Sequence, residues 1–153
     1  MKKLLMISAF GCMVQFANAQ TAEDSVKAVV NKMFDAMRAS DAAMLQSVFG
    51  DSALLQTISR NKEGKTVVRN ESITDFASSI SSAPKGSLDE RISFETIKID
   101  GPLASVWTPY SFYYNGKFSH CGVNSFQLVR INGEWKLQYI IDTRRKAGCV
   151  ENK

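Results

Sequence analysis

The sequence predicts an α+β domain in which three amino-terminal helices pack on an antiparallel sheet. Apolar residues recur at helical spacing in the first half of the chain, which is typical of amphipathic helices. In the second half, four strand-like runs are separated by Asp100-Gly101, Asn115-Gly116 and Asn132-Gly133, and each dipeptide suits a two-residue hairpin turn. Helices followed by antiparallel strands indicate that the helices lie on one face of the sheet.

Three segments are predicted to be helical. The first spans Glu23 to Arg38, and the second is short, with Ser40 or Asp41 as its cap. The third begins at Ser72, which stands three residues before Asp75 in a variant of the capping box. The apolar residues expected to face the core are, in order, Val26, Val29, Val30, Met33, Phe34 and Met37; then Leu45, Val48 and Phe49; then Ile73, Phe76, Ala77 and Ile80.

The predicted strands form one short hairpin and one meander. In the hairpin, the segment from Ala53 to Arg60 turns at Asn61 to Gly64 and closes with Val67 and Val68. The meander has four strands, which are Leu88 to Ile99, Leu103 to Tyr114, Phe118 to Ile131 and Glu134 to Thr143.

Residues 1–19 are predicted to be a cleavable signal peptide. Lys2 and Lys3 precede a short apolar run, and Ala17-Asn18-Ala19 is a small-residue cleavage pattern, so the mature chain would begin at Gln20. The run is too short for a membrane span, which takes about 20 apolar residues. A lipoprotein with lipid on Cys12 is the alternative, disfavoured because apolar residues continue beyond Cys12. We therefore expect a periplasmic or secreted protein with one domain at residues 20–153.

Charge and cysteine content fit an exported protein without a nucleic-acid partner. The chain has 19 basic and 15 acidic residues, and removal of Lys2 and Lys3 would leave a net charge near +2, too small to indicate nucleic acid. Cys121 and Cys149 would remain, an even number in an oxidising compartment. A disulfide between them is predicted, and two unpaired thiols are the alternative.

The order of elements resembles the nuclear transport factor 2-like superfamily. The segments that carry the resemblance are Ser40 to Leu45, Phe49 to Ala53 and Gly133 to Leu137. More narrowly, His120 to Asn124 and Asp142 to Arg145 resemble its SnoaL-like, lumazine-binding branch. The resemblance implies a cone-shaped, cystatin-like roll in which a curved sheet encloses a pocket. The superfamily includes ketosteroid isomerases and polyketide cyclases, so the likeness specifies fold much better than activity.

Hairpin geometry predicts which side chains face that pocket. A two-residue turn at Asn132-Gly133 places Leu128 opposite Leu137, and a one-residue shift would move every side chain to the other face. Pro109 indicates a bulge that would turn Tyr110 or Ser111 inward. The inner rows expected from this register are Phe94, Trp107, Asn124 and Ile141; then Thr96, Ser105, Phe126 and Tyr139; and at the mouth Glu90, Ser111, His120 and Arg145.

Several of these residues are candidates for ligand binding. Asn124 would need partners for three or four hydrogen-bonding sites, which a ligand, a buried water or the backbone can supply. His120 can bind a ligand or transfer a proton, or can be a hydrogen-bonded residue at the sheet edge. Arg145, with Arg144 beside Asp142, can bind an anion at the mouth or form a solvated strand end. The complete candidate set is Asn124, His120, Trp107, Tyr139, Ser111, Glu90 and Arg145, with core packing favoured over ligand contact for Trp107 and Tyr139.

A noncatalytic binding or scaffold domain is the favoured interpretation. A ketosteroid-isomerase type of enzyme needs an inward carboxylate base and a proton donor, but the predicted register points Asp142 outward. The expected ligand is a small apolar or aromatic molecule, with no cofactor and no metal, because one histidine and two cysteines do not form a ligand pattern. A third class, an interaction domain, depends on an apolar outer face that would pair as a homodimer. That face is expected to hold Val106, Thr108, Tyr110, Phe112, Val123 and Ile140.

Overall fold

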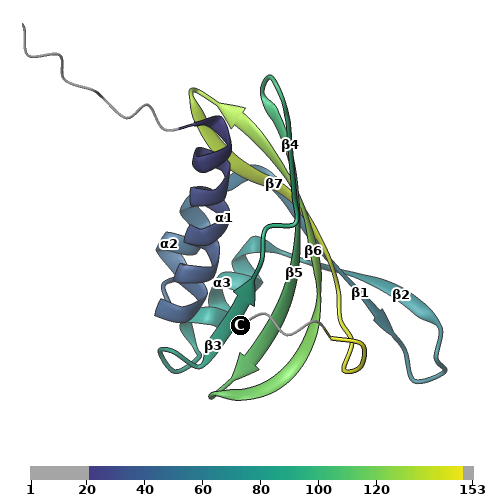
Figure 1. Ribbon diagram of the computed structural model, residues 1–153. Coiled ribbons are helices and arrows are strands. Elements are labelled where there is room, and N and C mark those ends of the chain that lie inside the picture. Colours follow the sequence, from purple (N-terminus) through teal and green to yellow (C-terminus); the bar gives the residue numbers. More distant parts are fainter. Residues whose placement is uncertain (1–20, 150–153) are drawn as a thin grey trace, which may run out of the picture.

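Three helices lie against the concave side of one strongly curved sheet in the computed structural model, which describes residues 21–149 (Figure 1). The helices are α1 (Ala22–Ala39), α2 (Ala42–Ser47) and α3 (Ile73–Ser81). The strands are β1 (Phe49–Arg60), β2 (Thr66–Glu71), β3 (Leu88–Ile92), β4 (Thr96–Asp100), β5 (Leu103–Tyr114), β6 (Lys117–Ile131) and β7 (Glu134–Thr143). The predicted α+β class is confirmed, and the predicted leader lies outside the described residues.

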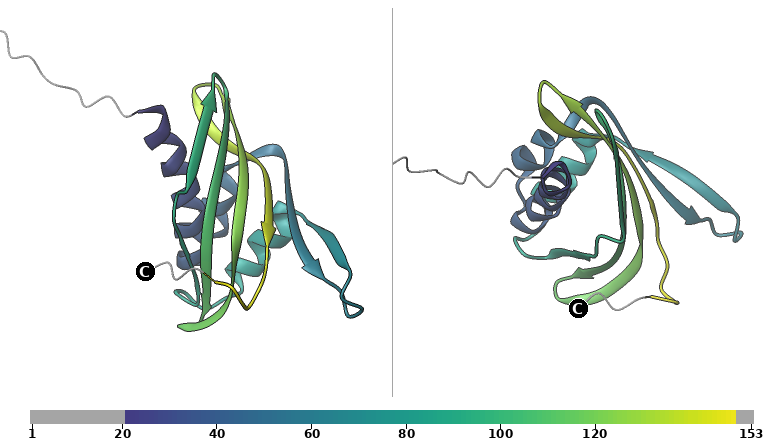
Figure 2. Two further views of the ribbon diagram at one scale, coloured as in Figure 1. Left: turned by 45° about the vertical axis from the view of Figure 1, so that its right-hand side comes forward. Right: turned by 45° about the horizontal axis from the view of Figure 1, so that its top comes forward.

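The sheet has the order β2-β1-β7-β6-β5-β3, and β4 also pairs with β5. Its pairings are antiparallel except that β1 runs parallel to β7, so the wholly antiparallel sheet expected from the sequence was wrong in this respect. The single strand expected from Leu88 to Ile99 is two strands, both on the edge of β5. Figure 2 shows the sheet curving around the helices, with the β1–β2 hairpin projecting beyond them.

The helix ends follow the predicted capping chemistry. Asp41 caps α2 by accepting a hydrogen bond from the main-chain N–H of Met44, and Ser72 caps α3 by accepting one from Asp75. α1 ends at Ser40, whose φ of 55° lies in the left-handed region. The apolar stripe of α1 packs on the sheet, where the rings of Phe34 and Phe126 meet edge to face at 6.2 Å.

Two of the three predicted hairpin turns are confirmed. Asn115-Gly116 and Asn132-Gly133 have positive φ at both residues, as a type I′ turn requires. The third turn is displaced by one residue, because Asp100 pairs with Leu103 and the loop is Gly101-Pro102.

A β-bulge near each confirmed hairpin changes the predicted register. In the β5–β6 pair, Tyr113 lies opposite Phe118 but Phe112 lies opposite His120, so Ser119 is the extra residue. In the β6–β7 pair, Leu128 lies opposite Leu137 as predicted, but Gln127 lies opposite Tyr139 and Gln138 is extra. Each extra residue shifts the strand pairing by one. As a result, the residues of β5 and β7 beyond the bulges face the side opposite to the one predicted.

The outer face expected for β5 and β7 was therefore wrong, whereas Val123 on β6 lies on the outer face as predicted. On β5 the residues that face the helices are Val106, Thr108 and Tyr110, each at most 2% exposed, and Ile140 on β7 is also buried. Large apolar residues that are exposed on the outer face are Leu54, Leu103 and Trp107. The homodimer inferred from the expected patch stays a prediction.

Candidate ligand-binding pocket

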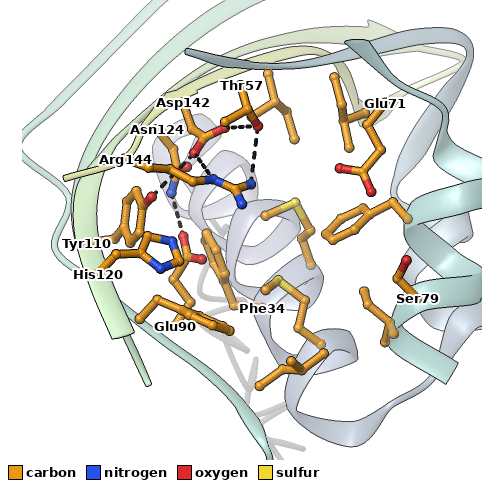
Figure 3. Close-up of a pocket in the computed structure, with 18 of the residues that line it drawn as sticks. Phe34, Thr57, Glu71, Ser79, Glu90, Tyr110, His120, Asn124, Asp142 and Arg144 are labelled. Atoms are coloured by element: carbon orange, nitrogen blue, oxygen red, sulfur yellow. Dashed lines mark hydrogen bonds and ion pairs between the residues drawn. The ribbon is translucent and has the colours of Figure 1, made fainter. Parts of the chain in front are cut away.

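A pocket of about 260 Å³ lies between the helices and the concave face of the sheet (Figure 3). One wall is apolar and comes mainly from the helices, through Met33, Phe34 and Met37 of α1 and Phe76 and Ile80 of α3. The other wall comes from the sheet. Its polar side chains, called the polar wall here, are Thr57, Glu71, Glu90, Tyr110, His120, Asn124, Asp142 and Arg144, and the sheet also contributes the apolar Leu55, Leu88, Phe112 and Ile140.

The bulge in β7 places Asp142 in this polar wall. Thr57 on the parallel strand β1 donates a hydrogen bond of 2.6 Å to Asp142 Oδ1, and Arg144 Nε donates one of 2.9 Å to Oδ2. Burial alone would lower the pKa of Arg144, but the charge of Asp142 and the hydrogen bond to it outweigh burial, so that pKa is raised. Asp142 is thus a paired carboxylate, and Arg144 is a fixed cation in the pocket wall.

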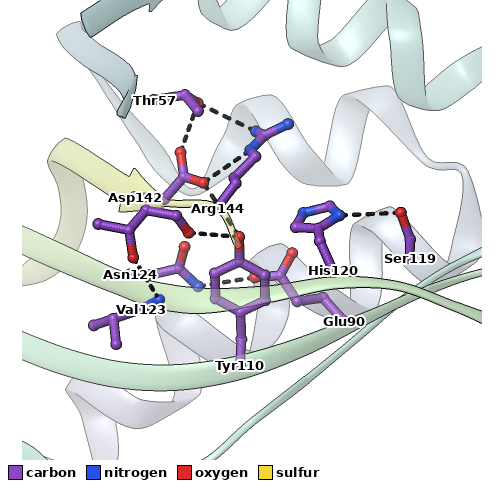
Figure 4. A network of polar contacts seen from close by, with 10 residues as sticks. Thr57, Glu90, Tyr110, Ser119, His120, Val123, Asn124, Asp142 and Arg144 are labelled. Atoms are coloured by element: carbon purple, nitrogen blue, oxygen red, sulfur yellow. Dashed lines mark hydrogen bonds and ion pairs between the residues drawn. The ribbon is translucent and has the colours of Figure 1, made fainter. Parts of the chain in front are cut away.

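Tyr110 on β5 reaches across β6 to this pair. Its hydroxyl group lies 2.9 Å from the carbonyl oxygen of Thr143 and 3.3 Å from Asp142 Oδ2 (Figure 4). The close approach depends on Gly122, because a Cβ at this position would overlap that carbonyl oxygen and the ring of Tyr110. Burial raises the pKa of Tyr110, and the charges of Glu90 and Asp142 raise it further, so the hydroxyl remains protonated.

Glu90 enters the pocket from β3 and receives a hydrogen bond of 2.8 Å from Asn124 Nδ2 to its Oε1. Burial raises the pKa of Glu90 to about 7; the bond from Asn124 opposes this shift, Asp142 adds to it and Arg144 opposes it. One side of the Glu90 side chain faces the hollow and keeps some accessible surface. The protein packed around its other sides removes water from the carboxylate, which is the burial that raises the pKa. At neutral pH, Glu90 can therefore accept or donate a proton.

His120 faces the same hollow from β6. Its ring lies between Tyr110, at 5.7 Å and perpendicular, and Phe112, at 5.1 Å. Its Nδ1 is 3.1 Å from the hydroxyl oxygen of Ser119. Burial lowers the pKa of His120, and the positive charge of Arg144 lowers it further, so the ring is neutral at pH 7.

Comparison with known proteins identifies the family of this chain. The family model described as "Putative lumazine-binding" matches residues 21–138. The chain belongs to this family. No curated protein matches the sequence.

Solved structures show the same fold. A nuclear transport factor 2-like protein of unknown function from Shewanella baltica is 16% identical, with a TM-score of 0.65 over 82% of this chain and 94% of that chain. A protein with a cystatin-like fold from Nostoc punctiforme is 13% identical, with a TM-score of 0.64 over 83% of this chain and 95% of that chain. These likenesses confirm the nuclear transport factor 2-like, cystatin-like fold and, at such identities, show the fold alone.

In this lumazine-binding family member, three of the predicted site residues line the pocket and four do not. Asn124, His120 and Glu90 lie in the polar wall. Trp107 is 45% exposed on the outer face, because the bulge at Ser119 reverses β5. Placing Trp107, Tyr139, Ser111 and Arg145 in the inner rows was therefore wrong.

The other three displaced residues have contacts elsewhere. The hydroxyl of Tyr139 donates a hydrogen bond of 2.6 Å to Gln56 Oε1, because the extra residue Gln138 turns it outward. Ser111 lies opposite Cys121, and Arg145 donates a hydrogen bond to the carbonyl oxygen of Gly148. The same bulge brings Asp142 inward, so its predicted outward orientation was wrong.

Thr57 and Glu71 are pocket residues that the sequence did not indicate. Both belong to the first hairpin, and only its parallel pairing with β7 brings it to the pocket. Burial raises the pKa of Glu71, while Arg144 opposes the shift. For the approach of Tyr110 to Thr143, by contrast, Gly122 was an available signal, because a glycine inside a strand often marks a close backbone approach.

The predicted disulfide is present. Cys121 and Cys149 are bonded, with their Cα atoms 5.7 Å apart, and Cys121 also pairs with Arg145 through main-chain hydrogen bonds. The bond ties the segment after β7 to β6. Among residues 21–149, no group of three or more His, Cys, Asp or Glu side chains is placed to hold a metal ion. None of the described helices is long and apolar enough to cross a bilayer.

Proposed function

We propose that this protein is an exported binding protein whose pocket holds a small ligand with an apolar body and one polar edge. The observation that carries the proposal is that apolar side chains of the helices and the sheet surround the pocket, while most of its polar and charged groups lie on the sheet side. Pockets of this composition bind apolar surface for affinity and use a few fixed polar groups for orientation. The volume of about 260 Å³ suits a molecule of two or three small rings.

The polar wall defines what the edge of the ligand must offer. Glu90 can accept a hydrogen bond when ionised and donate one when protonated, and its pKa of about 7 makes both forms accessible. The neutral ring of His120 can also donate or accept. Three carboxylates in the wall, Glu71, Glu90 and Asp142, favour a ligand edge that donates hydrogen bonds.

A neutral fluorescent probe tests the pocket as a binding site. N-phenyl-1-naphthylamine has an apolar two-part ring system with one N–H donor, and its emission increases when it leaves water. Ser79 on α3 lines the pocket, so Ser79→Trp should block it and abolish binding. Ser78→Trp is the matched control, because Ser78 is exposed and does not line the pocket. Equal probe binding by both variants would contradict the proposal.

An acid/base enzyme is the second candidate, and the position of Glu90 favours it. A carboxylate with a pKa of about 7 beside an apolar wall is suited to remove a proton bound to carbon. The Tyr110 hydroxyl, held at Asp142, and the neutral His120 ring are the available donors. The sequence predicted that Asp142 points outward, which counted against an enzyme, and this objection no longer holds because Asp142 and these groups all line the pocket.

The ring opening of 5-nitrobenzisoxazole separates the two candidates, because it needs only the removal of one carbon-bound proton. An acid/base pocket should accelerate it, with a rate that rises with pH through about 7 and is lost in Glu90→Gln. A wild-type rate no faster than that of Glu90→Gln supports a noncatalytic binding protein.

Export and self-association are further parts of the proposal. The disulfide between Cys121 and Cys149 is compatible with an oxidising compartment. Intact-mass analysis of exported protein should give a chain beginning at Gln20, whereas a lipid-bearing chain beginning at Cys12 would contradict it. For the homodimer, exposed Trp107 and Leu103 supply the apolar face. Sedimentation should show a dimer that Trp107→Arg dissociates.

A further inference from the structure

A second hollow lies beside the pocket, between the end of the β1–β2 hairpin and the segment that follows β7. It has a volume of about 410 Å³ and is called the basic groove here. The residues that line it are Ile58, Ser59, Arg60, Thr66, Thr143, Arg144, Arg145 and Lys146.

The basic groove is unusually cationic for its size. Four of its eight lining residues are Arg or Lys, and none is acidic. Of the four cations that line the groove, only Arg144 forms an ion pair with a carboxylate of residues 21–149; Arg60 and Lys146 form none there. The hydroxyl oxygen of Ser59 is buried and has no hydrogen-bond partner within the described part of the chain. Uncompensated cations and a free hydroxyl donor together match the oxygens of an anion.

The pocket has the opposite character. It contains Glu71, Glu90 and Asp142, with Arg144 as its one fixed cation within the described chain. An anionic group would be repelled there and attracted to the basic groove. Arg144 lines both hollows, with its Nε on Asp142 and its Nη2 on Thr57. The two hollows therefore meet at the Arg144 side chain.

We propose that the ligand is an anionic amphiphile, with its apolar body in the pocket and a phosphate, sulfate, sulfonate or carboxylate group in the basic groove. This inference depends on the proposed binding function. Arg60, Arg145, Lys146 and the Ser59 hydroxyl bind the anion, and Arg144 lies between the anion and the Asp142 carboxylate.

A pair of dyes with the same ring system tests the inference. 8-Anilino-1-naphthalenesulfonate is N-phenyl-1-naphthylamine with one added sulfonate, so the ratio of their dissociation constants reports the anion site. We expect the sulfonate to bind about tenfold more tightly at low salt. The variant Arg60→Gln with Lys146→Gln should remove most of this advantage and leave binding of the neutral dye unchanged.

A charge-matched control and a blocked pocket complete the experiment. Lys85→Gln with Lys117→Gln removes the same charge from exposed positions outside both hollows and should keep the tenfold ratio. Ser79→Trp should abolish binding of both dyes. Equal affinity of the two dyes for the wild-type protein, or an equal loss in both charge variants, would overturn the anionic-ligand inference while neutral-dye binding still supports the pocket. Binding of neither dye would overturn both proposals.

Discussion

The side-chain amide of Asn124 on β6 donates a hydrogen bond of 2.8 Å to the carboxylate of Glu90 on β3, across the intervening strand β5. The amide nitrogen, considered from sequence as a ligand anchor, is thus also a positioning group for the one pocket acid with a pKa of about 7. That Asn124 also contacts the ligand stays a prediction.

Asn124→Leu should raise the pKa of Glu90 above that of the wild-type protein, because the lost hydrogen bond stabilises the ionised carboxylate. The variant keeps the size of the side chain and should cost about 1 to 2 kcal/mol of unfolding free energy at neutral pH. Carbon-13 NMR titration of glutamate carboxyl groups measures the shift. An unchanged Glu90 titration would show that the bond does not tune this acid.

Glu90→Gln should change the pH dependence of stability. The folded protein holds the Glu90 proton up to about pH 7, whereas the unfolded chain releases it near 4.5. Between these values the folded state binds more protons, so this group makes stability fall as pH rises. Relative to the variant, the wild-type protein should lose about 3 kcal/mol between pH 4.5 and 7.5. Urea unfolding at several pH values measures the difference, and parallel curves would be inconsistent with a raised pKa.

Gly122→Ala should destabilise the fold by about 3 kcal/mol or more, because the new Cβ overlaps the main-chain carbonyl oxygen of Thr143 and the ring of Tyr110. Gly50→Ala is the control, since its Cβ would meet only the amide end of the flexible Gln138 side chain at less than 3 Å. Thermal unfolding of the two variants should differ clearly. Similar melting temperatures would mean that the β6–β7 approach is looser than described.

Replacing both Cys121 and Cys149 with alanine should lower the unfolding free energy by about 3 to 4 kcal/mol, from the entropy of the 28-residue loop that the bond closes. Urea unfolding of oxidised wild-type protein and the double variant gives this difference. If reduction leaves the intact mass unchanged and two thiols label without denaturant, the bond is absent from the isolated protein.

The sequence was sufficient for the helices and two hairpin turns, because each depends on local spacing and turn chemistry, and the order of these elements indicated the fold class. The disulfide was predicted from two cysteines in an oxidising compartment. The sequence was insufficient for the polar wall. Two single-residue bulges, at Ser119 and Gln138, decide which faces of β5 and β7 line the pocket, and neither residue type marks a bulge. Asp142 and Trp107 were assigned to the wrong faces for this reason. Thr57 reaches the pocket through a parallel pairing that no local pattern encodes.

Native mass spectrometry of protein purified from its own host tests the central claim, that the pocket between the helices and the sheet holds a small natural ligand. The wild-type protein and Ser78→Trp should each carry an added mass that denaturation releases, and Ser79→Trp should carry none. A wild-type protein with no added mass, or the same added mass on Ser79→Trp, would contradict the account.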